Sequence, residues 1–227
     1  MSPVLLGLTG PKGAGRLTAT NHLIKHHGFT AMSFQSIAVQ EICHCWVVPQ
    51  RVFDNATGSI LPSRYLCLRR CNNEKFVTWV LQHELNRGAL TKDQSSLHTL
   101  ELARSPTWIM AMWCAWRTSQ DEVHFLTKLY KRIKAQGAEN VVINDVQPQN
   151  TAHPHLAATV IHSGAEAELW QIDKPEPFDE RDFLYQPFPS ELVDRFLPNV
   201  GSVTTFLELI DLHLANWKFN ISKRFAG

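Results

Sequence analysis

The amino-acid sequence predicts an α/β fold, in which a parallel β-sheet carries helices on both faces. Short apolar runs alternate with helix-like segments along the chain, and a glycine-rich loop directly follows the first apolar run. Hydrophobic residues make up 44% of the 227 residues, enough for a sizeable core. Right-handed crossovers in such a sheet bring the loops that follow the strands to one edge, where ligands bind.

The first half of the chain begins with a short apolar run that reads as a buried strand. The predicted elements are a strand over 3–8, a helix over 16–26, a strand over 29–34, a helix over 36–46 and a helix over 74–85. Gly28 follows the first helix, as a C-cap residue would. Between 49 and about 70 the periodicity fails around prolines and arginines, a pattern typical of a lid or binding loop or else of a disordered segment.

The second half is predicted mainly from helix caps and apolar spacing. Ser105 and Pro106 are the residue types favoured at the N-cap and first position of a helix. Further elements are a helix over 121–136, strands over 140–146 and 167–172, and a closing helix near 203–217, after which a loose basic tail is expected. We therefore expect a single domain over 1–227, with a helical lid or substrate-binding insertion at about 47–120.

Charge and cysteine content limit the classes of function. The chain has 22 basic and 21 acidic residues, which argues against a nucleic-acid partner, and it contains no apolar run near the about 20 residues of a membrane span. Five cysteines cannot all pair, which favours a reducing cytoplasm. A zinc site built from Cys43, Cys45, Cys67 and Cys71 is an alternative, although their spacing is not a standard one. The eleven histidines show no ligand spacing.

The stretch from Gly7 to Thr18 resembles a phosphate-binding loop. Gly10 and Gly15 have the spacing of the G-x-x-x-x-G-K-[ST] pattern, but Arg16 stands at the lysine and Leu17 at the hydroxyl residue. Glycines permit the backbone conformations that aim N–H groups at phosphate oxygens. The predicted phosphate-binding residues are Gly10, Lys12, Gly13, Ala14, Gly15, Arg16, Leu17 and Thr18. An ordinary strand–helix turn is the alternative.

Charged residues elsewhere supply candidates for phosphoryl-transfer chemistry. Asp145 ends the apolar run from Val141, where magnesium-linked acids lie in P-loop enzymes, so it is a predicted catalytic residue. Asp145 and Thr18 are the predicted metal ligands. A strand-end acid or a helix cap is the plainer interpretation. Arginines are expected to neutralise phosphates: Arg16 and Arg117 in catalysis, and Arg64, Arg69, Arg70 and Arg104 in substrate binding. Trp108, Trp113 and Trp116 fit either a base-stacking surface or the core.

Four stretches carry a resemblance to a known family, namely residues 7–34, 105–125, 141–175 and 187–210. They are similar to the motifs G-L-T-G-x-x-x-S-G-K-D-T, S-P-R-x-x-L-Q-x-W-G-T, V-x-x-D-V-R-x-x-N-E-A and H-x-S-E. The chain thereby resembles the phage-type deoxynucleoside monophosphate kinases, relatives of dephospho-coenzyme A kinase. The resemblance implies a P-loop kinase fold, transfer of the ATP γ-phosphate to a deoxynucleoside monophosphate, use of Mg²⁺ and frequent dimers.

The resemblance also assigns residues by position. Asp145 falls on the acid of D-V-R, Arg117 on an arginine after the tryptophan helix, and four residues on substrate-side positions: Asn150, Lys174, Ser190 and Glu191. Departures from the family pattern affect charged positions, at Arg16, Leu17, Ser36, Val39, Thr107, Gln147, Thr151 and Phe188. Two hypotheses follow: a cytoplasmic ATP-dependent kinase (in a host cytoplasm if phage-encoded), or a catalytically impaired relative that binds a nucleotide or a protein.

Overall fold

A computed structural model describes residues 4–54, 60–86, 96–146, 166–173 and 188–225. The strands are β1 (Val4–Thr9), β2 (Thr30–Met32), β3 (Asn140–Ile143), β4 (Glu166–Asp173) and β5 (Arg195–Pro198). The helices are α1 (Arg16–His27), α2 (Phe34–Trp46), α3 (Arg51–Asp54), α4 (Glu74–Asn86), α5 (Ser96–Glu101), α6 (Pro106–Gln120), α7 (His124–Gln136) and α9 (Val203–Phe225).

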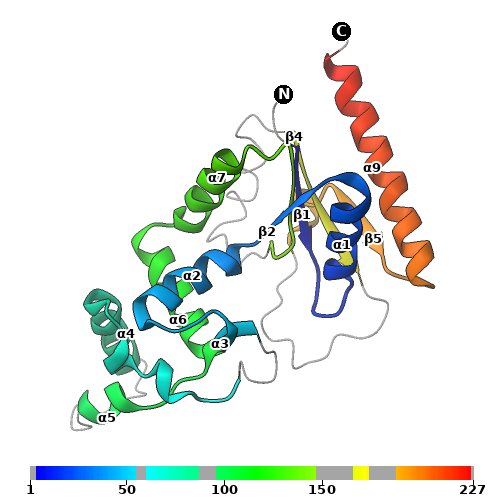
Figure 1. The fold of residues 1–227 in the computed structure, drawn as a ribbon. Helices are drawn as coiled ribbons and strands as arrows, with labels where there is room; N and C mark the ends of the chain where they lie inside the picture. Colours follow the sequence, from blue (N-terminus) through cyan, green and yellow to red (C-terminus); the bar gives the residue numbers. More distant parts are fainter. Residues whose placement is uncertain (1–3, 55–59, 87–95, 147–165, 174–187, 226–227) are drawn as a thin grey trace. The chain divides into compact units, whose positions relative to one another are not determined.

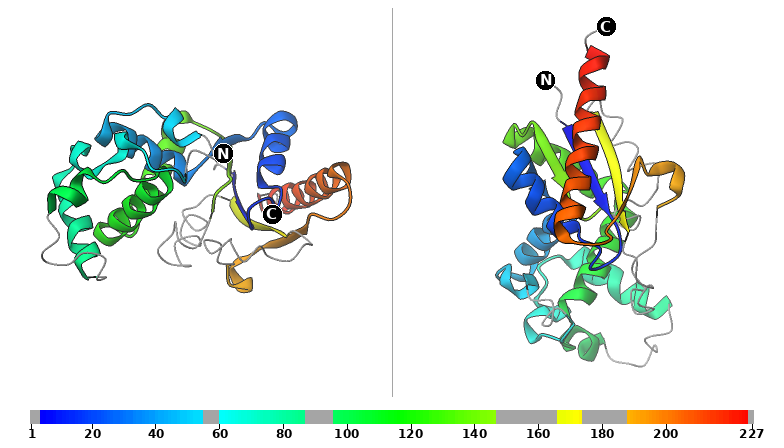
Figure 2. Two further views of the ribbon diagram at one scale, coloured as in Figure 1. Left: turned by 90° about the horizontal axis from the view of Figure 1, so that it is seen from below. Right: turned by 90° about the vertical axis from the view of Figure 1, so that its right-hand side faces the viewer.

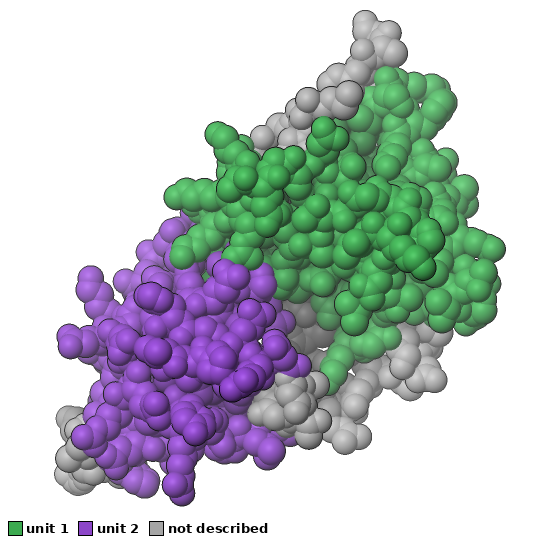
Figure 3. Space-filling model, viewed as in Figure 1, with its two compact units in different colours: residues 1–34, 125–227 green, residues 35–124 purple. Residues whose placement is uncertain are grey.

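The chain folds as two compact units, shown in Figure 3. The first unit comprises residues 1–34 and 125–227, and the second comprises residues 35–124. The insertion expected at about 47–120 falls within the second unit. The first unit holds the whole sheet, and the second is helical.

The sheet of the first unit is parallel throughout, in the order β2-β3-β1-β4-β5 (Figure 1). The first strand is central: Leu5 pairs with Val141 of β3 and with Ala167 of β4. Because every strand points the same way, the loops after β1, β2 and β3 meet at one edge. The predicted α/β class with a parallel sheet is confirmed: a central first strand leads through a glycine loop into a helix.

Alternating side chains of the strands build a core on each face. On one face Leu6, Leu8, Trp170 and other strand residues pack under α1 and α9. Helix α7, whose Phe125, Leu129 and Ile133 are buried, lies on the opposite side of the sheet (Figures 1 and 2). Helices therefore cover both faces, as the sequence predicted.

Four sequence expectations need correction. Strand β3 ends at Ile143 rather than at residue 146, because Asn144 and Asp145 form a turn. Strand β2 ends at Met32 rather than at residue 34, because a carboxylate accepts the Phe34 amide and starts α2 there. Strand β5 was not predicted: it has four residues, of which only Leu197 is buried. The expected loose tail is instead the continuation of α9 to Phe225, since Trp217 is buried in the core and Ile221 packs against it.

In the second unit, the segment from 49 to 70 is less irregular than expected. It contains α3 and two short 3₁₀ turns, Arg64–Leu66 and Leu68–Arg70. Beside it, α4 packs against α6, which begins as predicted with the Ser105 hydroxyl accepting the amide of Trp108 at 3.1 Å. Rings of Trp46, Phe76, Trp113 and Trp116 form the aromatic core of this unit.

Candidate functional site

The glycine loop lies against the backbone of β4 at the carboxyl edge of the sheet. Gly10 has φ of +142°, a conformation that L side chains rarely adopt. A Cβ atom at this position would lie 2.3 Å from the carbonyl oxygen of Ile172. Only glycine fits this contact, so the first glycine of the pattern is required by the close approach of two strands.

The remainder of the loop is a left-handed turn that faces outward. Gly13, with φ of +80°, has no neighbouring atom within 4 Å of the place a Cβ would take. The amide of Ala14 donates to the carbonyl of Pro11 at 3.2 Å and closes the turn. Gly15 is the N-cap of α1 in a left-handed conformation and supplies no side-chain cap. Lys12 and Gly13 are exposed at the tip of the glycine loop.

The first turn of α1 supplies hydrogen-bond donors at this edge. The amides of Arg16, Leu17 and Thr18 have no intrahelical acceptor, as at the start of any α-helix, and the helix dipole is positive there. Leu17 is 66% exposed, and the Thr18 side chain is also exposed. This combination of donors and open glycines is suited to phosphate oxygens.

Asn199, at the end of β5, holds the loop in place. Its Nδ2 atom donates to the carbonyl of Ala14 at 2.8 Å, and its own amide donates to Asp173 at 2.8 Å. A Cβ on Gly15 would lie only 2.7 Å from this Nδ2 atom, so the contact also depends on glycine. Sequence reasoning missed Asn199, although it lies in the stretch 187–210 that carries part of the family resemblance.

Arg16 and Asp145 lie at neighbouring strand ends. The Nη1 atom of Arg16 is 3.5 Å from the carbonyl oxygen of Asn144, directly before Asp145. The Asp145 carboxylate accepts from the Ser33 hydroxyl and from the Phe34 amide, each at 2.9 Å. Asp145 thus caps the start of α2 and links the segment after β3 to the residues after β2.

Two buried polar atoms lie next to the loop. Thr9 and Gln171 are paired in register at the ends of β1 and β4. Within the described part of the chain, neither the Thr9 hydroxyl nor the side-chain amide oxygen Oε1 of Gln171 has a hydrogen-bond partner. The sheet edge beside the loop therefore carries two buried polar atoms that form no hydrogen bond with the described residues.

The second unit contains a pocket of about 620 Å³, within the size range of small-molecule sites. Two predicted substrate residues, Arg64 and Arg70, line it with Tyr65. The guanidinium of Arg70 lies over the Tyr65 ring, 5.2 Å from the centroid. Apolar lining comes from Val52, Leu61, Pro62 and Pro106. The pocket thus combines cations, an aromatic ring and apolar surface.

Other predicted arginines are engaged in ion pairs. Arg69 pairs with Glu101 in an exposed position. Arg104 pairs with Glu84 at 3.0 Å and lies 4.1 Å from the centroid of the Trp108 ring. Neither residue lines the pocket that Arg64 and Arg70 share.

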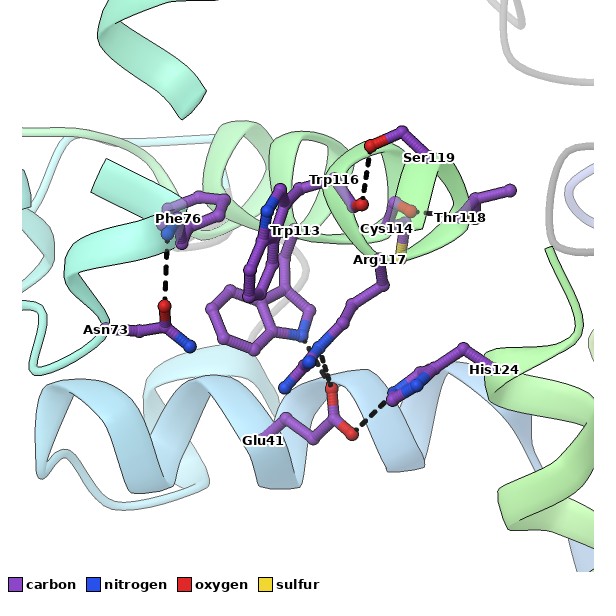
Figure 4. A network of polar contacts seen from close by, with 10 residues as sticks. All are labelled: Glu41, Asn73, Phe76, Trp113, Cys114, Trp116, Arg117, Thr118, Ser119 and His124. Carbon is purple, nitrogen blue, oxygen red and sulfur yellow. Dashed lines mark hydrogen bonds and ion pairs between the residues drawn. The ribbon is translucent and has the colours of Figure 1, made fainter. Parts of the chain in front are cut away.

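Arg117 belongs to a polar network around Glu41, drawn in Figure 4. One oxygen of Glu41 accepts from the Trp113 indole at 2.8 Å and from Nε of Arg117 at 3.1 Å. The other oxygen lies 2.8 Å from Nε2 of His124. Arg117 also lies over the rings of Trp113 and Trp116, both of which are buried core residues. Arg117 lies in the second unit, and Arg16 and Asp145 lie in the first.

The remaining predicted site residues lie in a short turn or outside the residues that the structure describes. Ser190 and Glu191 lie in a 3₁₀ turn, Ser190–Leu192, and are exposed. Asn150 and Lys174 lie outside the described residues. All five cysteines are free thiols, and no cysteine belongs to a metal-ligating group within the described ranges.

Comparison with known proteins adds a fold-level likeness. No family model matches the chain, and no curated protein matches it. Among solved structures, the chain is similar to dephospho-CoA kinase from Campylobacter jejuni at 9% sequence identity and a TM-score of 0.39, over 94% of this chain and 96% of that one. No helix in the described ranges is long and apolar enough to cross a membrane. A functional conclusion must therefore come from the geometry of the chain itself.

Proposed function

We propose that the protein binds the phosphates of ATP in the Gly10–Thr18 loop and transfers the γ-phosphate to a nucleoside monophosphate. The carrying observation is the position of this loop: it joins the central parallel strand to α1, with Gly13 open and the first helical turn facing outward. Strand ends at such an edge are where α/β proteins bind ligands.

The loop fits a polyphosphate through its backbone. Amides of Arg16, Leu17 and Thr18 would donate to phosphate oxygens, and the positive end of the α1 dipole would favour the negative charge. Arg16 would add a guanidinium in place of the usual lysine. Arginine is longer and planar, so it binds phosphate by a fork of donors rather than as a compact charge.

Mg²⁺ would be held by the Thr18 hydroxyl and by the Asp145 carboxylate, and would neutralise phosphate charge when bound. Thr18 is exposed on the first turn of α1. Asp145 lies beside the carbonyl that Arg16 approaches. Its contacts with the Ser33 hydroxyl and the Phe34 amide orient the carboxylate.

The phosphate acceptor is proposed to bind in the pocket of the second unit. Arg64 and Arg70 would pair with a phosphate monoester, and Tyr65, 60% exposed, offers a ring for a planar base. A deoxynucleoside monophosphate has both parts. Arg104 and Arg69 would act around this pocket only indirectly, because Glu84 and Glu101 already engage them.

One observation favours the alternative of a catalytically impaired relative that binds nucleotide or a protein. The side chain of Arg16 is directed to the Asn144 carbonyl, and both Asp145 oxygens serve the start of α2. A group used for structure is less available to a migrating phosphoryl group. Losing one preorganised donor commonly lowers kcat by about 10²–10³-fold.

A coupled assay with ATP, Mg²⁺ and each deoxynucleoside monophosphate tests the proposal. Turnover is expected, and Asp145→Asn, which keeps an acceptor for the Phe34 amide, should abolish it without unfolding the chain. An ATP-dependent rise in Tm without turnover would support the impaired alternative. If Arg16→Lys raises kcat, the native arginine is an impairment. If the chain shows no turnover and no ATP-dependent rise in Tm, both the kinase and the nucleotide-binding alternative are wrong.

A further inference from the structure

A cluster of metal-ligating side chains lies between α1 and α9, on the face that these helices cover. Nε2 of His22 is 2.6 Å from Oδ1 of Asp211, and Nε2 of His27 is 2.7 Å from the same oxygen. All three ligand atoms lie within 4.8 Å of one another. The two helices pack together in the first unit (Figure 1). Residues about 190 positions apart in the chain thus converge on one point.

His22 and His27 reach the same carboxylate because His27 lies at the very end of α1, next to the left-handed Gly28. Residues five positions apart on an ideal α-helix point about 140° away from each other. His27 is the last residue of α1, and Gly28 follows with φ of +68°. Asp211, on α9, lies within reach of both rings. The three side chains are partly shielded, with exposures of 12% for His22, 24% for His27 and 47% for Asp211.

We propose that His22, His27 and Asp211 form a binding site for a divalent transition-metal ion, with Zn²⁺ the best fit. Two imidazoles and one carboxylate are a ligand set that zinc and other first-row transition metals use, with water in the remaining position. Mg²⁺ and Ca²⁺ prefer oxygen ligands, so this site is distinct in chemistry from the nucleotide's metal.

The observed contacts are close to what the ion requires. Zinc binds imidazole nitrogen and carboxylate oxygen at about 2.0–2.2 Å, so tetrahedral ligand atoms lie about 3.3 Å apart. The two nitrogen–oxygen distances must therefore lengthen by about 0.6 Å on binding. Asp211 is the side chain able to adjust, because it is the most exposed of the three. Burial alone would raise the pKa of Asp211, but hydrogen bonds from His22 and His27 outweigh it, and the pKa is lowered.

The site would join α1 to α9 at the far end of α1 from the glycine loop. Arg16 begins the helix, and at 1.5 Å per residue His22 and His27 lie about 9 Å and about 17 Å further along its axis. Metal binding and nucleotide binding can therefore be measured separately. Zinc binding stands whether or not the protein is a kinase.

Cobalt(II) titration of the full chain is the test, because visible d–d bands report the ligand geometry and near-ultraviolet charge transfer reveals any thiolate ligand. One equivalent should bind without thiolate bands, and Zn²⁺ should displace it. Asp211→Asn and His27→Ala should each weaken binding at least about tenfold, since even outer-sphere partners of a metal commonly contribute about 10–100-fold. His44→Ala, which removes an exposed histidine on α2, is the matched control and should bind unchanged.

Asp211→Asn preserves the shape of the side chain and an acceptor oxygen, so the variant is expected to fold, as circular dichroism would check. The proposal is overturned if the wild-type chain binds no cobalt, if binding shows thiolate bands, or if Asp211→Asn binds as tightly as the wild type. If the wild-type chain binds no cobalt, the three residues only form hydrogen bonds that link α1 to α9.

Discussion

Asn199 donates a hydrogen bond of 2.8 Å from Nδ2 to the carbonyl oxygen of Ala14, and this contact ties the end of β5 to the glycine loop. The two residues are 185 positions apart. Because the peptide unit is planar, fixing the Ala14 carbonyl also fixes the direction of the Gly15 amide. The shape of the loop is therefore maintained from the far end of the chain.

Replacing Asn199 by alanine should weaken nucleotide binding more than it destabilises the fold. The lost hydrogen bond corresponds to about 1 kcal/mol, or roughly fivefold in the Kd for ATP. Isothermal titration with ATP would measure it. Asn216→Ala, on the exposed surface of α9, is the matched control and should leave Kd unchanged. Equal affinity in the Asn199 variant and the wild type would show that the loop holds its shape without this contact.

Gly10 and Gly13 of the loop are predicted to differ in their tolerance to alanine. Gly10→Ala places a Cβ 2.3 Å from the Ile172 carbonyl, and the residue must keep a φ of +142°. Gly13→Ala meets no atom within 4 Å and keeps only the strain of its positive φ. We expect Gly10→Ala to lower the free energy of unfolding by about 3 kcal/mol or more and Gly13→Ala by about 1 kcal/mol. Urea unfolding compares them, and similar losses in both would contradict the close approach.

Local patterns predicted those parts of the fold that depend on neighbours in sequence. The apolar run of β1, the Gly28 cap of α1 and the Ser105 cap of α6 all involve residues within a few positions of each other. Strand β5 was not predicted because its four residues include only one buried side chain, too few to show the alternating hydrophobic pattern of a strand. The length of α9 escaped because Trp217 and Ile221 pack onto core residues from distant strands.

The candidate site was predictable where its chemistry lies in one stretch. The glycines of the loop fall together in the sequence, and so do Arg64 and Arg70 of the pocket. Asn199 and Asp211 act through partners almost a full chain length away, and only the packing of β5 and α9 brings them there. For the same reason the linear spacing of the histidines gave no metal signal.

Cys71 is predicted to be an unreactive thiol. Burial raises its pKa to about 12, although a backbone hydrogen bond from Asn73 acts in the opposite direction. A pKa above the ordinary value of about 8.5 favours the neutral form, so at pH 8 the thiolate is depleted roughly thousandfold relative to the unfolded chain. Iodoacetamide labelling followed by peptide mass spectrometry should find Cys71 modified only after urea is added. Rapid labelling in the native chain would contradict its burial.

Glu41 is predicted to act mainly on the stability of the second unit. Its carboxylate is bound by Trp113, Arg117 and His124, with only 10% of its side chain exposed. Glu41→Ala leaves the Arg117 guanidinium without its counterion and should lower the free energy of unfolding by about 2–4 kcal/mol. Glu122→Ala, an exposed acid nearby in the sequence, should change it by less than about 0.5 kcal/mol.

A double-mutant cycle separates this structural role of Arg117 from a catalytic one. If Arg117 serves Glu41, the losses from Glu41→Ala and Arg117→Ala are non-additive, with a coupling of about 1–3 kcal/mol in urea unfolding. Tryptophan fluorescence follows the transition, since Trp113 and Trp116 lie against the pair. If the two losses of unfolding free energy are additive and Arg117→Ala also lowers kcat selectively, the guanidinium is instead assigned to phosphate chemistry. A group that contacts the transferred phosphoryl lowers kcat when removed, whether or not it is coupled to Glu41 in stability.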